Sequence, residues 1–283
     1  MSFDKKIISF LSAPGGVGKT TLALVLSLFL ALDGKRVLML DLDPSYGLSL
    51  RVLPFRVYQG RVRNGKTMDR LIKKFHEGEE ELDYRDYITE YRYHSIFFNL
   101  IISTEKLSEV IDTIWYGSEA GREYLLREVI ENLGLLNDWD LIILDTIPFY
   151  EPKYSILTYM ASDLCIIPLR PSIIDVTRTI NMLNTLKRKI RRIVRDEREL
   201  MSRFGVVFNL VWKGRRSERK IPEYKNRISN ETSPHVYLFE KYILDREAFR
   251  RINTQEETGS DLNIIQQVFS PVYEEILSLI KHT

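Results

Sequence analysis

The sequence predicts an α/β fold, in which a doubly wound, mostly parallel sheet carries helices on both faces within one domain spanning residues 1–283. Two observations support this prediction. Short, continuous apolar runs, typical of strands buried on both faces, alternate with segments of helical periodicity. In addition, no repeat, low-complexity tract or Pro/Gly/Ser-rich linker divides the chain. With 283 residues, 44% of them hydrophobic, the chain is long enough to bury a full core without disulfides.

The first half of the chain begins with the apolar run 7–11, which ends at Pro-Gly-Gly and is typical of a buried strand. A helix is expected over about 19–32, where Asp33-Gly34 ends the apolar periodicity. The run 36–44 predicts a second buried strand, closed by Pro44. Weaker patterns predict, in chain order, a helix at 67–75, an extended segment at 96–102, and two helices within 104–136 that separate near Gly117.

The second half continues the alternation of strands and helices. In chain order we expect strands at 140–145 and 163–169, a long helix at about 175–203, strands at 204–212 and 235–239, and helices around Arg246 and over 262–280. Strands that are each followed by a helix favour a parallel sheet covered on two sides.

Composition excludes several classes of protein. The single cysteine, Cys165, can neither form an intramolecular disulfide nor build a metal or iron–sulfur site of cysteine ligands within one chain, and it favours a reducing compartment. No stretch reaches the ~20 apolar residues of a membrane span. The apolar segment at the start of the chain is too short for a secretory signal. We therefore expect a soluble, cytoplasmic protein.

A glycine-rich loop with the sequence Ser-Ala-Pro-Gly-Gly-Val-Gly-Lys-Thr-Thr occupies residues 12–21, between the first strand and its helix. Backbone N–H groups of such a loop wrap a phosphate chain, and the helix N-terminus favours the anion. We expect Lys19 to reach the β- and γ-phosphates and the Thr20 hydroxyl to bind Mg²⁺. The expected nucleotide-binding residues are Gly15, Gly16, Val17, Gly18, Lys19, Thr20 and Thr21. The alternative is a glycine-rich turn with an incidental lysine.

This loop resembles the deviant Walker A motif of the ParA/MinD family, in which the core Gly-Gly-x-Gly-Lys-Thr-Thr is usual. The resemblance implies a single-domain P-loop NTPase fold, ATP and Mg²⁺ as cofactors, and a homodimer that forms on ATP binding. The family normally has a second lysine directly before Gly-Gly, which reaches the partner's phosphates, and this chain has Pro14 there. The resemblance therefore implies nucleotide binding with slow hydrolysis.

Three carboxylates follow expected strands. The segment 41–44, Asp-Leu-Asp-Pro, resembles the family's DxDP segment, and strand alternation places Asp41 and Asp43 on one side. We expect Asp41 to support the Mg²⁺ shell and Asp43 to orient the attacking water, which makes Asp43 and Lys19 the candidate catalytic residues. Asp145, after the apolar run 141–144, fits a Walker B aspartate. The expected metal-binding residues are Thr20, Asp41 and Asp145. The alternative interpretation of these carboxylates is a set of polar strand ends.

Later segments extend the resemblance through most of the chain. Residues 161–172 resemble a strand and its exit, and residues 243–249 resemble the late segment that borders the base. Asn209, in Val-Phe-Asn, resembles the family's asparagine that hydrogen-bonds adenine. A cap at the end of the strand is the equally weighted alternative for Asn209.

Basic residues concentrate in one part of the chain. Residues 187–227 contain 15 Lys and Arg against 5 Asp and Glu, although the whole chain carries a net charge of only +2. A basic face on the expected long helix is the electrostatic footprint of a phosphate-backbone binder. A solvated helix face is the alternative. The candidate DNA-binding residues are Lys187, Arg188, Arg191, Arg195, Arg198, Arg215 and Arg216.

Together these features predict a ParA-like ATPase for plasmid or chromosome partition. It would bind ATP–Mg²⁺, dimerise, bind DNA without sequence preference, associate with the nucleoid and act with a ParB-like partner. One alternative, favoured by Pro14, is a nucleotide-switched binding protein with little hydrolysis. A second is a MinD-like positioning ATPase, but the tail 271–283 has paired glutamates and makes a poor membrane anchor.

Overall fold

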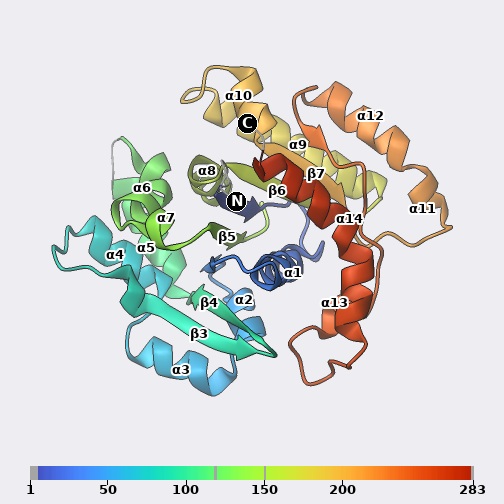
Figure 1. The fold of residues 1–283 in the computed structure, drawn as a ribbon. Coiled ribbons are helices and arrows are strands. Elements are labelled where there is room, and N and C mark those ends of the chain that lie inside the picture. Colours follow the sequence, from blue (N-terminus) through green and yellow to red (C-terminus); the bar gives the residue numbers. More distant parts are fainter. Residues whose placement is uncertain (1–5, 118–119, 150, 282–283) are drawn as a thin grey trace.

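The computed structural model describes residues 6–117, 120–149 and 151–281. One eight-stranded sheet runs through the molecule in the order β3-β4-β2-β5-β1-β6-β7-β8 (Figure 1). All neighbouring strands are parallel except the edge pair β3 and β4, so the predicted mostly parallel α/β fold is confirmed. The strands are β1 Ile7–Phe10, β2 Val37–Leu42, β3 Ile88–Tyr93, β4 Ile96–Ile101, β5 Leu141–Thr146, β6 Leu164–Leu169, β7 Phe204–Phe208 and β8 Tyr237–Leu238.

The α-helices connect these strands and cover the sheet. They are α1 Lys19–Leu32, α2 Gly47–Val52, α3 Phe55–Arg63, α4 Met68–His76, α5 Lys106–Gly117, α6 Leu125–Asn132, α7 Leu135–Asp138, α8 Pro152–Ala161, α9 Ile173–Ile190, α10 Glu197–Ser202, α11 Arg216–Arg219, α12 Ile221–Glu231, α13 Ala248–Arg251 and α14 Asp261–Lys281.

The strands pack on both faces because successive side chains alternate in direction. On β1, Ile8 and Phe10 pack into the cluster formed with α1, α2, α13 and α14. Ile7 points to the opposite face, which α4–α8 cover, and α8, α9, α10 and α12 continue that layer over β6 and β7. Figure 1 shows α4–α7 on one side of the view and α9 with α12 on the other. Both faces are therefore buried, as the apolar strands require.

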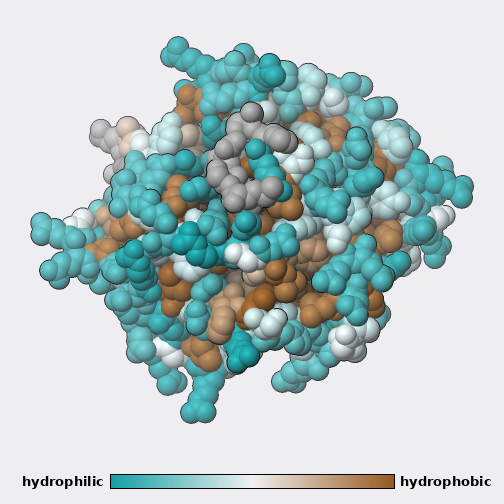
Figure 2. All heavy atoms as spheres, in the orientation of Figure 1, coloured by the Kyte–Doolittle hydropathy of each residue, from teal (hydrophilic) through white to brown (hydrophobic). Residues whose placement is uncertain are grey.

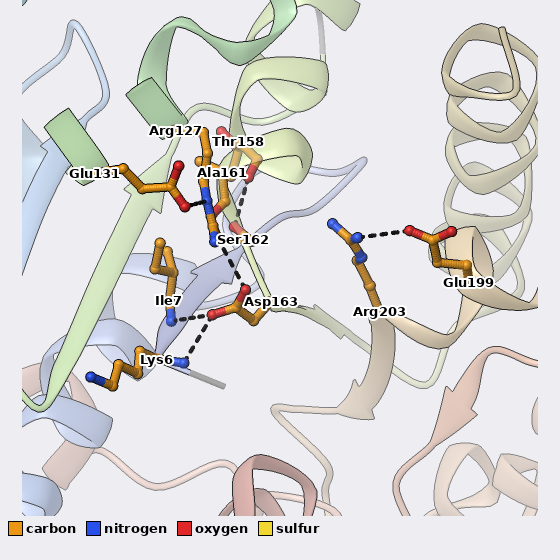
Figure 3. A network of polar contacts seen from close by, with 10 residues as sticks. All are labelled: Lys6, Ile7, Arg127, Glu131, Thr158, Ala161, Ser162, Asp163, Glu199 and Arg203. Carbon is orange, nitrogen blue, oxygen red and sulfur yellow. Dashed lines mark hydrogen bonds and ion pairs between the residues drawn. The ribbon is translucent and has the colours of Figure 1, made fainter. Parts of the chain in front are cut away.

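A polar network fixes the amino-terminal ends of β1 and β6 relative to each other (Figure 3). Oδ2 of Asp163 accepts hydrogen bonds from the backbone N–H groups of Lys6 and Ile7, each at 2.9 Å. Nη1 of Arg127 donates to Oδ1 of Asp163 and to the Ala161 carbonyl, both at 3.1 Å. The start of β1 is thereby held in register, which determines where the loop at its other end lies.

The prediction of one long helix over 175–203 is wrong. α9 ends at Ile190, and a turn follows before α10. Oδ1 of Asp196 accepts the Glu199 N–H and caps α10, so a new helix begins where the pattern predicted a continuous one. The strand expected at 204–212 ends at Phe208, and Leu210, two residues later, has a φ of 56°. The sequence also did not predict β3, α2, α3, α8 or α12.

The structure also shows where the C-terminal segment lies. α14 buries Ile265, Phe269 and Ile276 against α1 and the sheet, which makes it a docked helix. Across the described residues, no helix combines the length and apolar character needed to cross a membrane.

Candidate nucleotide-binding site

The glycine-rich loop lies at the carboxyl end of β1, between the ends of β5 and β6. In open α/β sheets this edge is where ligands bind. Gly16 and Gly18 have φ values of 68° and 92°, in the region that favours glycine. Gly18 is the N-cap of α1, no side chain caps that helix, and its first turn contains no acidic residue. Its backbone N–H groups are therefore suited to an anion.

Gly18 is also required by close packing. A Cβ atom at this position would lie 2.6 Å from Nδ2 of Asn209. That amide nitrogen donates to the Val17 carbonyl at 2.8 Å and so attaches the loop to the end of β7. The structure thus gives Asn209 a loop-holding role that the sequence did not predict, while the expected adenine contact remains a prediction.

Lys19 begins α1 with its side chain largely buried. Its Nζ donates to Oγ of Ser12 at 3.0 Å, and that hydroxyl donates to the Pro14 carbonyl at 2.7 Å. Burial lowers the pKa of Lys19, and the nearby carboxylates of Asp145 and Asp43 oppose this shift. The ammonium group is therefore oriented by the loop's own residues. Ser12 had no role in the sequence-based prediction.

Asp41 is fully buried near the end of β2. Oδ1 accepts the Asp43 N–H at 3.1 Å, and Oδ2 accepts the Ser49 N–H at 2.8 Å and the Ser49 hydroxyl at 2.6 Å. Burial raises the pKa of Asp41 to about 8, and the Asp145 charge adds to the rise. Asp43 is half-buried at the strand exit, where its Oδ1 accepts the Ser45 N–H at 2.8 Å.

Asp145 is the register partner of Asp41 on the adjacent strand β5. It is fully buried, and neither carboxylate oxygen accepts a hydrogen bond from another described residue. Burial raises the pKa of Asp145 to about 7, while the Thr20 hydroxyl and the Lys19 charge, which are close to the carboxylate without forming a hydrogen bond of good geometry, oppose the rise. A buried carboxylate without a partner calls for a missing ligand. Carboxylate and hydroxyl oxygens are the donors that Mg²⁺ prefers, so the residues present fit this ion.

A cavity of about 230 Å³ lies beside the loop. Asn209 and the segment after β8, which the sequence predicted to lie near the base, both line this cavity. Its lining residues are Gly16, Gly18, Thr21, Leu22, Asn209, Leu210, Leu244, Arg246, Phe249 and Arg250. The structure therefore brings the loop, the end of β7 and the segment 243–249 together, as the sequence predicted.

Position 14 offers no cationic side chain to the site, since it is a buried proline. Arg170, at the exit of β6, is one basic candidate at this end of the sheet, besides Arg246 and Arg250 of the cavity wall. Its Nε donates to Oδ2 of Asp175 at 2.7 Å and its Nη2 to Oδ1 at 3.4 Å, and the Asp175 side chain is only 3% exposed. The guanidinium group is thus held in an ion pair with the first turn of α9.

The basic residues do not lie on one face of a single helix, as the sequence predicted. α9 starts at the carboxyl end of β6 and runs back to the amino end of β7. Its last turn therefore lies at the amino-terminal end of the strands, opposite the P-loop. There lie Lys187, Arg188, Arg191, Arg195 and Arg198. Arg215 and Arg216 follow β7 and lie at the loop's edge. Figure 1 shows α10 and α11 far apart, and Figure 2 shows a hydrophilic surface over both. In addition, Nζ of Lys187 forms an ion pair with Oε1 of Glu197 at 2.7 Å.

Comparison with known proteins now relates this site to a family. A family model described as AAA domain matches residues 5–198. An uncharacterized protein of Methanocaldococcus jannaschii is 27% identical over 235 residues, which cover 81% of each chain. The chromosome-partitioning ATPase Soj of Treponema pallidum is 28% identical over 186 residues, which cover 65% of this chain and 64% of that protein.

Solved structures share the whole fold. Apo McdA from Cyanothece superposes with a TM-score of 0.72 at 21% identity, covering 97% of this chain and 98% of McdA. A plasmid partition protein from Borrelia burgdorferi bound to AMPPNP gives a TM-score of 0.68 at 19% identity, covering 96% and 98%. With the family match over most of the chain and the loop geometry described above, this chain belongs to the ParA/MinD family of P-loop ATPases.

Proposed function

We propose that this protein is a partition-type ATPase that binds ATP–Mg²⁺, dimerises around the nucleotide and binds DNA without sequence preference. The observation that carries the proposal is the unpartnered, buried Asp145 carboxylate beside a P-loop whose lysine is already oriented. The relatives named for chromosome and plasmid partition support the biological task. A nucleoid location and a ParB-like partner follow from the same proposal.

In this mechanism the chain's residues bind and orient the nucleotide. The N–H groups of residues 15–21 would surround the phosphates, and Lys19 would exchange its bond to Ser12 for the phosphate oxygens. Thr20 and Asp145 would hold Mg²⁺, with Asp41 beside them in register. When bound, this ion supplies positive charge that neutralises the phosphates. Asp43, half-buried at the strand exit, would orient the attacking water.

Hydrolysis in this mechanism is slow. Proline at position 14 has neither a charge nor an N–H group to offer the phosphates. Arg170 cannot replace the missing lysine without breaking its pair with Asp175. A nucleotide-switched binding protein with little turnover is therefore the second candidate function, and the identity of residue 14 is the observation that favours it.

DNA binding is assigned to the exposed arginines at the amino-terminal edge of the sheet. Arg191, Arg195 and Arg198 are exposed around the turn between α9 and α10. Among the described residues none of these three side chains forms an ion pair, whereas the neighbouring Glu199 is paired with Arg203 at 3.1 Å. Free guanidinium groups bind backbone phosphates and release counterions, which gives affinity without sequence preference.

We expect Asp145→Asn to stabilise the metal-free, nucleotide-free protein more at pH 8 than at pH 5. The folded pKa is about 7, above the ordinary value near 3.9 in the unfolded chain, so the folded state retains a proton that the unfolded chain releases. Stability from this group is consequently lost as the pH rises through 7, and asparagine avoids that loss. The extra gain at pH 8 should be on the order of 2 kcal/mol.

Urea denaturation in EDTA at both pH values measures this difference. The matched control is Glu80→Gln, which neutralises an exposed carboxylate and should give no pH-dependent gain. An equal effect of Asp145→Asn at both pH values would contradict the assignment of a destabilising buried charge.

Pro14→Lys should raise the rate of ATP hydrolysis, by about tenfold or more, because it restores a cross-subunit charge that acts in the transition state. Pro14→Ala is the control, since it restores an N–H group without a charge and should have a much smaller effect. Phosphate release at saturating ATP measures the rate. No increase in the lysine variant, with ATP bound and dimers formed, would mean that another group already supplies the charge.

The double reversal Arg191→Glu/Arg195→Glu should weaken binding to duplex DNA by at least tenfold and equally for unrelated sequences. The slope of log K against log salt should also become shallower, by about 0.9 for each phosphate that the variant no longer neutralises. Gel shifts with ATP, at several salt concentrations, measure both effects. The control Arg56→Glu/Lys241→Glu makes the same change in net charge at exposed positions elsewhere. If the control weakens DNA binding as much, the turn between α9 and α10 is only a solvated surface.

A further inference from the structure

A cavity of about 520 Å³, larger than the one beside the phosphate loop, lies between the α3–α4 loop and the first turns of α4 and α5. These elements lie together in the lower left of Figure 1, next to β3 and β4. The volume falls within the range of small-molecule binding sites, ~300–1,000 Å³. None of the residues 12–21 of the P-loop lines it, so this cavity is separate from the nucleotide site.

The lining of this cavity carries an excess of unpaired positive charge. The side chains of Arg63, Arg70 and Lys106 line it and have neither an ion-pair nor a hydrogen-bond partner among the described residues. Lys66 and Lys74 also line it, but they are paired with Asp86 at 2.7 Å and with Glu79 at 2.8 Å. Three free cations around one cavity favour a ligand with a phosphate group, which arginine binds through two parallel hydrogen bonds.

A second feature of the cavity calls for hydrogen-bond donors on the same ligand. Asp69 lines the cavity although it is only 3% exposed. Its Oδ1 accepts the Thr104 hydroxyl at 2.8 Å, whereas Oδ2 has no partner among the residues that the structure describes. Oδ2 is therefore free to accept a hydrogen bond from a donor group of a ligand in the cavity. The other acidic lining residue, Glu105, is exposed at the rim.

Aromatic side chains form part of the cavity wall. The rings of Tyr46 and Tyr58 are stacked, with centroids 5.3 Å apart and an interplanar angle of 24°. Both tyrosines line the cavity, but Tyr58 is buried and also stacks on Phe55, so the half-buried Tyr46 supplies the aromatic surface that a ligand can reach. Such a surface accommodates a sugar or a base beside the phosphate group.

We propose that this cavity is a second ligand site, for a small phosphate ester that also carries hydroxyl or amino donors, such as a sugar phosphate or a nucleoside monophosphate. Arg63, Arg70 and Lys106 bind its phosphate, and Oδ2 of Asp69 accepts a hydrogen bond from its donor group. Tyr46 contacts the remaining part of the ligand.

The wall of this cavity is hydrogen-bonded to the nucleotide site. The Tyr58 hydroxyl donates to the Ser103 carbonyl at 3.2 Å, and the Ser103 N–H donates to Oγ of Ser49 at 3.0 Å. That hydroxyl in turn donates to Asp41 at 2.6 Å. A ligand against Tyr46 is therefore linked, through the Tyr58 ring stacked on it, to a chain of hydrogen bonds that ends at a carboxylate of the P-loop site.

The test uses the full-length Lys19→Ala variant, in which the P-loop is disabled, so its result does not depend on the proposed ATPase function. Calorimetry with AMP and ribose 5-phosphate should show saturable binding of at least one, and adenosine and ribose, which lack the phosphate, should bind at least tenfold more weakly. Wild-type protein saturated with ADP–Mg²⁺ provides the same measurement if the variant does not fold.

Adding Arg63→Ala/Arg70→Ala should weaken binding of the phosphate ester at least tenfold. The matched control Arg56→Ala removes an exposed arginine of α3 that does not line the cavity, and it should leave binding unchanged. Absence of saturable binding by both esters would overturn the proposal, as would an equally large effect of the control. Binding of duplex DNA alone, sensitive to Arg63→Ala/Arg70→Ala, would also overturn it and would assign these arginines to a DNA surface.

Discussion

The register of β1 between its two parallel neighbours is the constraint on which the site depends. Phe10, the last residue of β1, is paired with Asp145 on β5 and with Ile166 on β6. This register places the P-loop, which follows β1, beside the Asp145 carboxylate. At the opposite end of the same strand, Asp163 binds the N–H groups of residues 6 and 7 and prevents a shift in register (Figure 3). A shift by one residue would turn every side chain of the strand to the other face.

This register places ionisable groups where water cannot solvate them. Asp41 and Asp145 are adjacent, fully buried and both raised in pKa, and the pKa of Lys19 nearby is lowered. Buried charges of this kind cost stability unless they are paired or coordinate a metal. These buried charges lie at the carboxyl ends of the strands. A bound triphosphate and Mg²⁺ at this place would offset the stability that they cost. Strongly shifted pKa values at one edge of an α/β sheet are thus the physical mark of the site.

The central strands, α1 and the P-loop could be predicted because their signals are local. A buried strand is a continuous apolar run, and the loop follows it directly in the sequence. The contact of Asn209 with Val17 joins segments 192 residues apart, and the contact of Ser49 with Asp41 depends on α2, which the sequence did not predict, so no local pattern indicated either. The edge strand β3, with its exposed Glu90 and Arg92, lacks the apolar run that marked the other strands.

The basic segment shows how a local pattern can mislead. Ile190, Ile193 and Leu200 continue a helical spacing across the turn after α9, so the sequence predicted one long helix and one charged face. The cap at Asp196 begins a new helix instead. The parallel crossover then places the two groups of arginines at opposite edges of the sheet, which only the topology could reveal.

The central claim is that the loop at residues 12–21 binds ATP through Lys19. Titration calorimetry of ATP with Mg²⁺ into the wild-type protein, Lys19→Ala and the exposed-site control Lys241→Ala tests it most directly. We expect saturable binding by the wild type and by the control, and no measurable binding by Lys19→Ala with an unchanged circular dichroism spectrum. Wild-type affinity in a folded Lys19→Ala variant would contradict the account.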